Sequence, residues 1–361
     1  MHEEEKKYAN ALNYVPEFGP KTLEKIRVTF GSFKKAWEAE IREYLRIPNL
    51  DKKSLISLDR IKKEINPDKE LNNLEKEGVS ILLSEELPTS LKNTPSAPEI
   101  LYIRGSLPPE TYNFLGVVGT RRYSAYGKEA TTGIVENLAG HNFVIVSGLA
   151  KGIDSFSHET AIKNKIKTIA VLGSGLSPKV LFPKENKRLA DRIVSEGGAV
   201  VSEYPYEMKA NINSFPQRNR IIAGLSKAVW VVEAKEKSGS LITANYALDY
   251  DRDVLALPGS IFLENSKGTN GLIKQGAATI TSAIDILNIF GIESENCISE
   301  KILDLSEMEN NLLKEITEPI QKDELIRKTG LSAGEVIPVL TLLELKGAIK
   351  DMGGEIIKIA K

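Results

Sequence analysis

The segment Phe143-Val144-Ile145-Val146-Ser147-Gly148-Leu149-Ala150-Lys151-Gly152-Ile153-Asp154 contains the pattern that decides the fold. Its four leading apolar residues predict a short buried strand, its two glycines mark a loop, and residues 155–163 predict a helix. Most of the other apolar runs are likewise followed by Gly, Ser or Thr and then by a helical stretch. These other runs are 101–103, 115–118, 168–172, 199–201, 229–232 and 254–257.

Continuous apolar strands that alternate with helices indicate a parallel sheet covered by helices on both faces. The predicted fold class is therefore α/β, an extended Rossmann-like, doubly wound and mostly parallel sheet. Such a sheet binds ligands at the carboxyl ends of its strands. The loops that follow the strands are thus the first place to look for chemistry.

The two flanking regions have different patterns. Residues 1–85 show helical apolar spacing interrupted by Gly, Pro and Asn, and residues 88–98 contain three prolines, as in a linker. Residues 306–361 predict three helices and a hairpin around Gly353-Gly354, the arrangement of a winged helix. We expect three domains: helical 1–85, Rossmann-like 86–290 and winged-helix 300–361.

The charge distribution singles out the middle of the chain. The 361 residues carry a formal net charge of −1. Residues 98–290 hold 22 basic and 18 acidic side chains, a net charge of +4, whereas residues 291–361 hold 9 and 14, a net charge of −5. A polyanion is therefore expected to bind the middle region rather than the C-terminal one.

Several classes of protein are disfavoured by composition. Cys297 is the single cysteine, and His2, His141 and His158 are scattered, so neither a disulfide nor a metal site is predicted. The charged N-terminus lacks the apolar region of a signal peptide. No apolar run approaches the roughly 20 residues of a membrane span. We expect a cytoplasmic protein with no membrane association, no metal and no cofactor.

Four strand-end loops combine glycine with hydroxyl, amide or cationic side chains. Glycine lets a backbone approach an anion closely, hydroxyls and amides donate to it, and Lys or Arg neutralises it. Neither a Walker lysine motif nor a dinucleotide fingerprint is present. The loops therefore predict a phosphate-bearing ligand other than a P-loop nucleotide or a dinucleotide. They are 119–122, 147–154, 173–176 continuing to 182–187, and 233–240.

Residues 214–226 place Arg218, Asn219 and Arg220 at the start of an apolar helix. A helix N-terminus is mildly unfavourable for cations unless an anion joins them, and phosphate suits both arginine forks and helix amides. The two arginines lie about 200° apart around a helix, so both cannot face one pocket. One is expected to reach the ligand and the other to brace the loop or meet an adjacent phosphate. In the alternative, both pair with carboxylates such as Glu203 or Glu233.

Candidate catalytic groups are few. His158 is interpreted as a packing or helix-capping histidine, because a general base needs a placed partner. Asp154 is expected to cap the helix that follows it. Glu233 could be a catalytic carboxylate or could bridge to a neighbouring arginine. We expect a protein that is not an enzyme.

Together these segments resemble the DNA-processing protein A (DprA/Smf) family. The matching pieces occur in the family's order and span most of residues 100–285, and the flanking helical and winged-helix domains fit a common family layout. The matching pieces are 119–121, 147–154, 215–226, 238–244, 258–259 and 268–273.

The resemblance implies a single-stranded DNA-binding recombination mediator that protects incoming DNA and loads RecA in natural transformation. It also implies a homodimer built through the Rossmann-like domain. A groove of cations and loop amides suits binding through phosphates, and Phe182 or Phe215 would stack on bases. The DNA-binding residues expected by position are Gly119, Thr120, Arg121, Ser147, Gly148, Lys151, Lys184, Lys187, Arg218, Asn219, Arg220, Ser238 and Ser240, with Lys184 and Lys187 as alternatives for one role.

The chain departs from the family pattern near both ends. Residues 15–22 resemble a helix-hairpin-helix turn within a SAM-like or helix-hairpin-helix-like helical domain, but Glu17 stands where the first glycine is expected. The candidate recognition helix 333–346 contains Glu335 and Glu344 and has Lys346 as its one basic residue. A DNA-reading helix usually brings more cations. We therefore expect the winged helix to contact protein, or no known partner, rather than duplex DNA.

Two other functions fit the fold less well. A nucleotide phosphoribohydrolase of the lysine-decarboxylase-like type uses a P-G-G-x-G-T-x-x-E segment, but residues 258–264 lack its second and third glycines and its threonine. A nucleotide-sensing regulator with a winged-helix DNA reader is disfavoured by the acidic C-terminal region.

Overall fold

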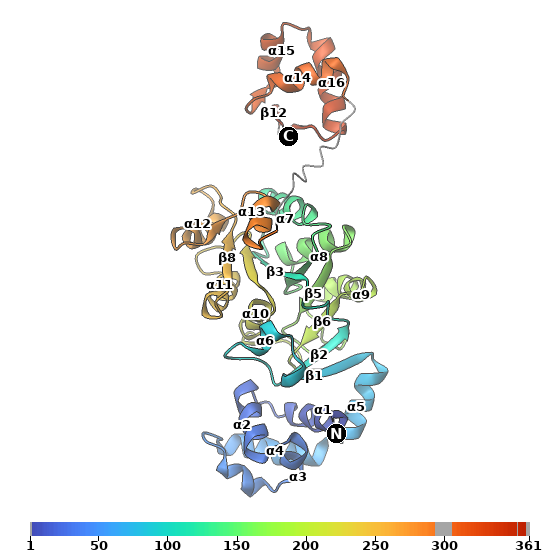
Figure 1. Ribbon diagram of the computed structural model, residues 1–361, viewed down its shortest axis with the longest axis vertical. Helices are drawn as coiled ribbons and strands as arrows, with labels where there is room; N and C mark the ends of the chain where they lie inside the picture. Colours follow the sequence, from blue (N-terminus) through green and yellow to red (C-terminus); the bar gives the residue numbers. More distant parts are fainter. Residues whose placement is uncertain (1, 293–304, 352, 359–361) are drawn as a thin grey trace. The chain divides into compact units, whose positions relative to one another are not determined.

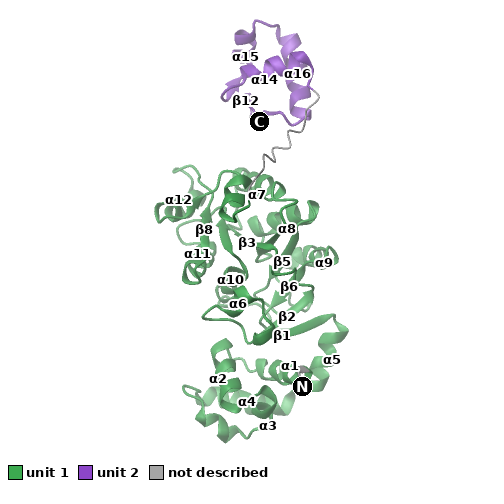
Figure 2. Ribbon diagram, in the orientation of Figure 1, with its two compact units in different colours: residues 1–292 green, residues 293–361 purple. Residues whose placement is uncertain are grey.

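The computed structural model describes residues 2–292, 305–351 and 353–358. These residues form two compact units, 1–292 and 293–361 (Figures 1 and 2). The expected C-terminal domain, 300–361, begins within residues 293–304, which lie outside the described residues. The expected boundary between residues 85 and 86 falls inside the first unit and stays a prediction.

A nine-stranded sheet organises the first unit, with the strand order β1-β2-β6-β5-β4-β3-β7-β8-β9. The strands from β6 to β9 along this order are parallel, whereas β2 pairs antiparallel with β6 and β1 antiparallel with β2. The predicted mostly parallel, doubly wound sheet is confirmed. Its strands are β1 (Val79–Leu83), β2 (Ile100–Gly105), β3 (Asn113–Val118), β4 (Phe143–Ser147), β5 (Lys167–Val171), β6 (Ala199–Ser202), β7 (Ala228–Val231), β8 (Asp253–Ala256) and β9 (Ala278–Thr279).

Apolar runs form the central strands because both faces of the sheet are buried. Successive side chains of a strand point to opposite faces. In β4, Val144 and Val146 join one core cluster, whereas Phe143 and Ile145 join another. Helices α10, α11 and α12 cover the first face and α7, α8 and α13 the second. These helices are α7 (Ala125–Glu136), α8 (Ile153–Lys163), α10 (Ser214–Leu225), α11 (Gly239–Asp249), α12 (Glu264–Lys274) and α13 (Ala283–Ile289). Two further helices of this unit are α6 (Thr89–Lys92) and α9 (Lys187–Ser195).

The N-terminal residues form the predicted helices and one strand that the sequence did not predict. The helices share an apolar cluster with β1 and with residues of β2, β5 and β6. Residues 79–83, grouped with the helical region 1–85, instead form β1, because Val79, Ile81 and Leu83 alternate inward on an edge strand. The N-terminal helices are α1 (His2–Asn13), α2 (Pro20–Phe30), α3 (Phe33–Glu38), α4 (Lys52–Glu64) and α5 (Pro67–Lys76).

The second unit has the expected winged-helix elements. Three helices and a three-stranded sheet of order β10-β12-β11 surround a separate apolar core. The short strand β10 was not predicted from sequence. The elements are α14 (Glu307–Glu315), β10 (Ile320–Gln321), α15 (Lys322–Thr329), α16 (Ala333–Leu345), β11 (Ile349–Asp351) and β12 (Glu355–Lys358). No helix among the described residues is long and apolar enough to cross a membrane.

Candidate functional site

A cleft of about 460 Å³ lies at the carboxyl ends of β3, β4 and β7. Strand β3 pairs with β4 on one side and with β7 on the other, so the order of the strands reverses at β3. The loops on the two sides of such a reversal diverge and leave a crevice, which is where doubly wound sheets bind ligands. We call this cleft the strand-edge pocket. Its lining comes from the loops after these three strands and from the first turns of α8, α10 and α11.

Cationic side chains from two loops surround the strand-edge pocket. Arg121 and Arg122 follow β3, and Lys235 and Lys237 follow β7. The guanidinium carbon of Arg121 lies 5.5 Å from the centre of the Phe215 ring, within the range of a cation–π contact. Asp154 also lines the pocket, but cations outnumber this carboxylate, and a cleft with an excess of one sign of charge concentrates counter-ions, so the pocket is suited to an anionic ligand.

Arg218 is buried in the wall of the strand-edge pocket and holds two strand ends in place. Its Nη1 donates to the carbonyl of Gly148 at 2.7 Å and to the carbonyl of Val171. A Cβ atom at Gly148 would lie only 2.6 Å from the guanidinium, so a larger residue here would displace the Arg218 side chain. Burial lowers the pKa of Arg218 to about 10, and the nearby Asp154 opposes that shift. Arg218 therefore stays cationic at neutral pH.

Arg220 faces away from the strand-edge pocket. It is buried and forms an ion pair with the buried Glu203 through Nη2, and its Nη1 has no hydrogen-bond partner among the described residues. Burial raises the pKa of Glu203, and the Arg220 charge acts in the opposite direction. Of the two arginines, Arg218 lines the pocket and also braces its loops, whereas Arg220 forms part of the protein interior.

The N-terminus of α11 forms another wall of the strand-edge pocket. Ser238 caps this helix, with its Oγ accepting from the Ser240 amide at 3.4 Å and lying 2.7 Å from the Ser240 hydroxyl. Asn219 connects α10 to this helix start by donating to the Gly239 carbonyl at 3.1 Å. Helix N-termini favour anions because of their unpaired amides and their dipole. This end of α11 therefore adds to the positive electrostatic potential that the loop cations create in the pocket.

The remaining predicted residues are divided between the strand-edge pocket and other parts of the fold. Gly119 and Thr120 line the pocket. Ser147 is fully buried and donates to the Val117 carbonyl at 2.6 Å, and Lys151 forms an exposed ion pair with Glu185 at 2.6 Å. Lys184 and Lys187 are exposed and lie outside the lining. The loop after β5 borders the pocket through Phe182, whose ring centre lies 5.5 Å from that of Phe215.

Three lining cations are absent from the predicted set. Arg122, Lys235 and Lys237 belong to the same two loops as the predicted Arg121 and Ser238. The sequence could have indicated these three residues, because a strand-end loop brings all its cations to the same edge of the sheet.

Two acidic residues have structural roles that differ from those expected. Asp154 is the second residue of α8 rather than its cap, and its Oδ2 accepts from the amides of Gly148 and Ala150 at 3.1 and 3.3 Å. Burial raises the pKa of Asp154, against the lowering effect of Arg218. Glu233 neither meets an arginine nor lies in the cleft. It accepts from the amide and hydroxyl of Ser124 at 2.9 and 2.5 Å, at the start of α7.

His158 packs in the interior, in agreement with the interpretation favoured from sequence. The Thr168 hydroxyl donates to the Ile145 carbonyl at 2.8 Å, so it accepts from His158 Nδ1 at 2.7 Å. His158 Nε2 is then unprotonated, and it is buried with no partner among the described residues. Burial, with a smaller effect of the Arg218 charge, lowers the pKa of His158 to about 3.

His158 should make the protein less stable in mild acid. Its pKa is about 6.5 when unfolded and about 3 when folded, so between these values the unfolded chain binds the additional proton. The stabilisation from neutral His158 is complete above pH 6.5 and decreases as the pH falls towards 3, by about 2 kcal/mol between pH 7 and pH 5. His158→Asn keeps a donor for Thr168 without titrating. Chemical denaturation at the two pH values should show a smaller stability loss in this variant, and an equal loss in both proteins would contradict the assignment.

The winged helix presents an apolar and acidic surface on its third helix. Ile337, Leu342 and Leu345 of α16 are exposed, and the adjacent Lys346 is paired with Glu309 at 2.8 Å. Duplex DNA requires cations on the helix that enters its groove. The expectation that this helix contacts protein stays a prediction, and tight, salt-sensitive duplex binding by residues 300–361 would contradict it.

The fold and the site define a class of protein: a doubly wound α/β sheet with a mainly cationic cleft at its switch point, followed by a winged helix. The chain belongs to the DNA recombination-mediator protein A family. Residues 79–291 match the model of that family, and residues 302–355 match the DprA winged helix domain.

Individual relatives agree with this assignment. The chain is 39% identical to protein Smf of Escherichia coli over 290 residues, 77% of this chain and 76% of that one. It is 31% identical to protein Smf of Synechocystis, with 98% of both chains covered. The solved structure of DNA processing protein A from Streptococcus pneumoniae has a TM-score of 0.68 at 34% identity, covering 78% of this chain and 97% of that one. DNA processing protein A from Helicobacter pylori, solved in a study of its single-stranded DNA binding, has a TM-score of 0.51 at 29% identity, covering 59% and 95%.

Proposed function

We propose that this protein binds single-stranded DNA in the strand-edge pocket and acts as a recombination mediator. The observation that carries the proposal is the convergence of Arg121, Arg122, Lys235 and Lys237, with the buried Arg218, on one cleft. Nucleic-acid affinity is dominated by the neutralisation of backbone phosphates, which requires cations in this arrangement and is tolerant of sequence.

The aromatic residues beside these cations favour a single strand over a duplex. Phe215 lines the cleft under Arg121, and Phe182 packs beside Phe215 with about half of its surface exposed. Proteins that bind single strands combine a cationic groove with aromatic faces on which unpaired bases stack. In a duplex the faces of the bases are covered by neighbouring base pairs, so they cannot stack on these side chains. The related Helicobacter pylori protein, described as binding single-stranded DNA, supports the same ligand.

The proposal extends to the partners that the family resemblance implies. The protein would hold incoming single strands in the cytoplasm during natural transformation and load RecA on them as a homodimer formed through the sheet-containing unit. In this role it performs no covalent chemistry and needs no cofactor. The apolar surface of α16 would be available to a protein partner.

Strand binding and RecA loading can be tested with the same purified protein. We expect salt-sensitive binding of a single-stranded oligonucleotide, weaker binding of the matching duplex, and no competition by mononucleotides. We also expect faster RecA filament formation on a strand already covered by a single-strand-binding protein. Equal affinity for duplex, or tight binding of a mononucleotide, would contradict the ligand assignment. Unchanged filament formation would contradict the loading step alone.

The phosphoribohydrolase alternative gains no support from the geometry. Glu264, at the end of the segment that would supply its catalytic glutamate, is exposed and pairs with Lys267 at 2.9 Å and with Lys235 at 3.6 Å. Glu233 is engaged at the start of α7. Release of a base from a nucleoside monophosphate would overturn our preference for a binding protein.

A further inference from the structure

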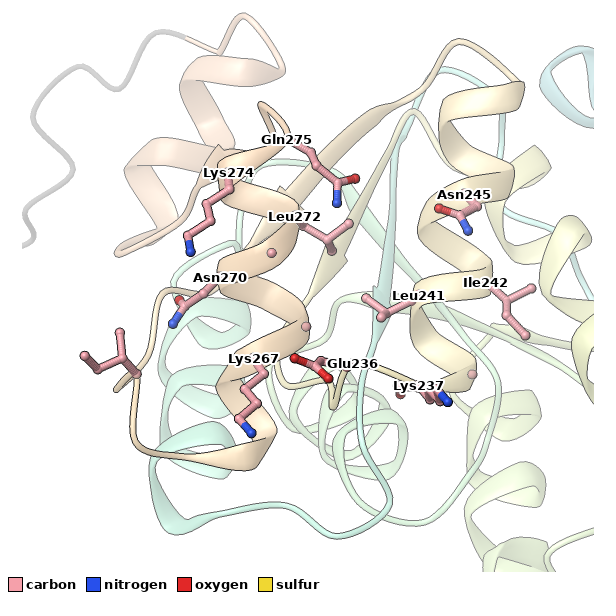
Figure 3. A pocket seen from close by; sticks show the side chains of 15 residues that line it. Glu236, Lys237, Leu241, Ile242, Asn245, Lys267, Asn270, Leu272, Lys274 and Gln275 are labelled. Atoms are coloured by element: carbon pink, nitrogen blue, oxygen red, sulfur yellow. The ribbon is translucent and has the colours of Figure 1, made fainter.

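Two surfaces adjoin the strand-edge pocket, one on each face of the sheet. On the side of α11, Lys237, Ser238 and Gly239 also line a hollow between α11 and α12 (Figure 3). Glu236 contributes a carboxylate to that hollow, and α12 leads to β9, the last strand at that end of the sheet. Because an edge strand can pair with another chain, that side suits the proposed homodimer better than a polyanion.

On the other face of the sheet, the strand-edge pocket borders the starts of α7 and α8. Arg121 and Arg122 line the pocket, and the chain passes directly from them through Tyr123 to the start of α7. Asp154 also lines the pocket, and Phe156 follows it two residues later in α8. Helices α7 and α8 pack against each other (Figure 1). Side chains from both helix starts therefore continue the surface of the pocket on this face.

Tyr123 and Phe156 connect these two helix starts through an aromatic contact. Their ring centres are 4.6 Å apart and their planes meet at 89°, an edge-to-face arrangement. The contact holds the Tyr123 ring in place, yet 45% of Tyr123 remains exposed. Since the edge of one ring meets the face of the other, Phe156 covers at most one face of the Tyr123 ring. Proteins that bind single strands stack unpaired bases on aromatic faces held beside a cationic groove in this way.

Lys128 brings a cation to the same aromatic pair. Its Nζ lies 5.2 Å from the centre of the Phe156 ring, and it forms no ion pair among the residues that the structure describes. The exposed Glu129 and Glu159 belong to the same two helices, so this surface has less excess positive charge than the strand-edge pocket. The aromatic face, rather than charge, therefore distinguishes the surface. We call the side chains of Tyr123, Lys128 and Phe156 the α7 platform.

We propose that the α7 platform stacks a base of the single strand where the strand leaves the strand-edge pocket. The inference rests on the proposed function and adds an outer contact to the same binding site. A base lies on the exposed face of Tyr123, and Lys128 contacts the phosphate next to that base. Phe156 positions the tyrosine ring without touching DNA. Because every base has an aromatic face, this contact is tolerant of sequence.

Three substitutions of Tyr123 in the full chain separate stacking from packing. Tyr123→Leu keeps an apolar side chain against Phe156 but removes the aromatic face. It should bind a single strand of about 12 nucleotides about fivefold more weakly, the low end of the contribution of one stacked base. The dependence on salt should match wild type, because no phosphate contact is lost. Tyr123→Phe keeps the ring and should bind like wild type. Tyr123→Trp should also bind, and a stacked base should quench the fluorescence of the added indole.

Tyr126→Leu is the matched control for Tyr123→Leu. Tyr126 is 47% exposed and lies three residues further along the chain, but its hydroxyl donates to the carbonyl of Pro258, in the loop after β8, at 2.8 Å. Its replacement should leave strand affinity unchanged. Lys128→Ala, in contrast, should reduce the slope of log affinity against log salt concentration by about 0.7, the value for one phosphate contact.

The possible results distinguish the α7 platform from the pocket. Wild-type affinity in Tyr123→Leu would overturn the proposal, as would an equal loss in Tyr123→Phe or in Tyr126→Leu, since the loss would then come from local structure rather than stacking. Weaker binding by the double variant Arg121→Ala/Lys237→Ala would leave the proposed function standing in each of these cases. If that double variant also binds the strand normally, the proposed function itself fails.

Discussion

Replacing Arg121 and Lys237 together with alanine is expected to weaken single-stranded DNA binding about 30-fold at 0.1 M salt, because two phosphate contacts are lost. Each such contact contributes about 0.7 to the slope of log affinity against log salt concentration. Both side chains line the strand-edge pocket, and neither forms an ion pair among the described residues. Arg218 remains as the larger cationic neighbour of Asp154 when Arg121 is removed. Fluorescence anisotropy over a range of salt concentrations measures both the affinity and its dependence on salt. Thermal unfolding of the variant should match wild type.

The matched control for this pair is Lys151→Ala. Lys151 is an exposed cation of a neighbouring strand-end loop, but it is paired with Glu185 and lies outside the lining. Its replacement should change the affinity by less than about twofold, as expected for an exposed pair. If Lys151→Ala weakened binding as much as the double variant, the strand would run along the surface of the loops rather than in the cleft.

Replacing Arg220 with methionine is expected to destabilise the protein by about 3–5 kcal/mol, because the carboxylate of Glu203 would remain buried without its cation. Arg220 and Glu203 are 6% and 8% exposed. Combining Arg220→Met with Glu203→Leu removes both charges and should recover most of the lost stability. The free energy of unfolding from urea titration measures each effect.

Strand binding distinguishes the interior role of Arg220 from a role in the site. At a temperature where the double variant is folded, it should bind single-stranded DNA with the affinity of wild type. A stable but non-binding Arg220 variant would instead show that this arginine contacts the strand, as the sequence allowed.

The sheet and its ligand-binding edge could be predicted because they depend on local patterns. Each central strand is a short apolar run, and parallel strands necessarily place the loops that follow them at one edge. Arg121, Arg218 and Ser238 are therefore close in space although almost 120 residues separate the first from the last. Strand β1 was missed because its five residues follow a long helical region and pair only at the edge of the sheet.

The finer assignments depended on tertiary packing. Helical geometry separates Arg218 from Arg220, but which of them faces the cleft depends on how α10 lies on the sheet. Glu233 caps α7 through Ser124, 109 residues earlier in the chain, and no local spacing indicates that contact.

The hydrogen bonds of Arg218 to Gly148 and Val171 have a consequence for the speed of binding. Because this buried guanidinium already fixes the ends of β4 and β5, the loop after β4 would not have to become ordered if a strand bound in the cleft. Encounter would then depend mainly on diffusion and on the attraction of the basic cleft for the strand. A loop that is fixed in advance in this way would favour the capture of a strand that is exposed only briefly.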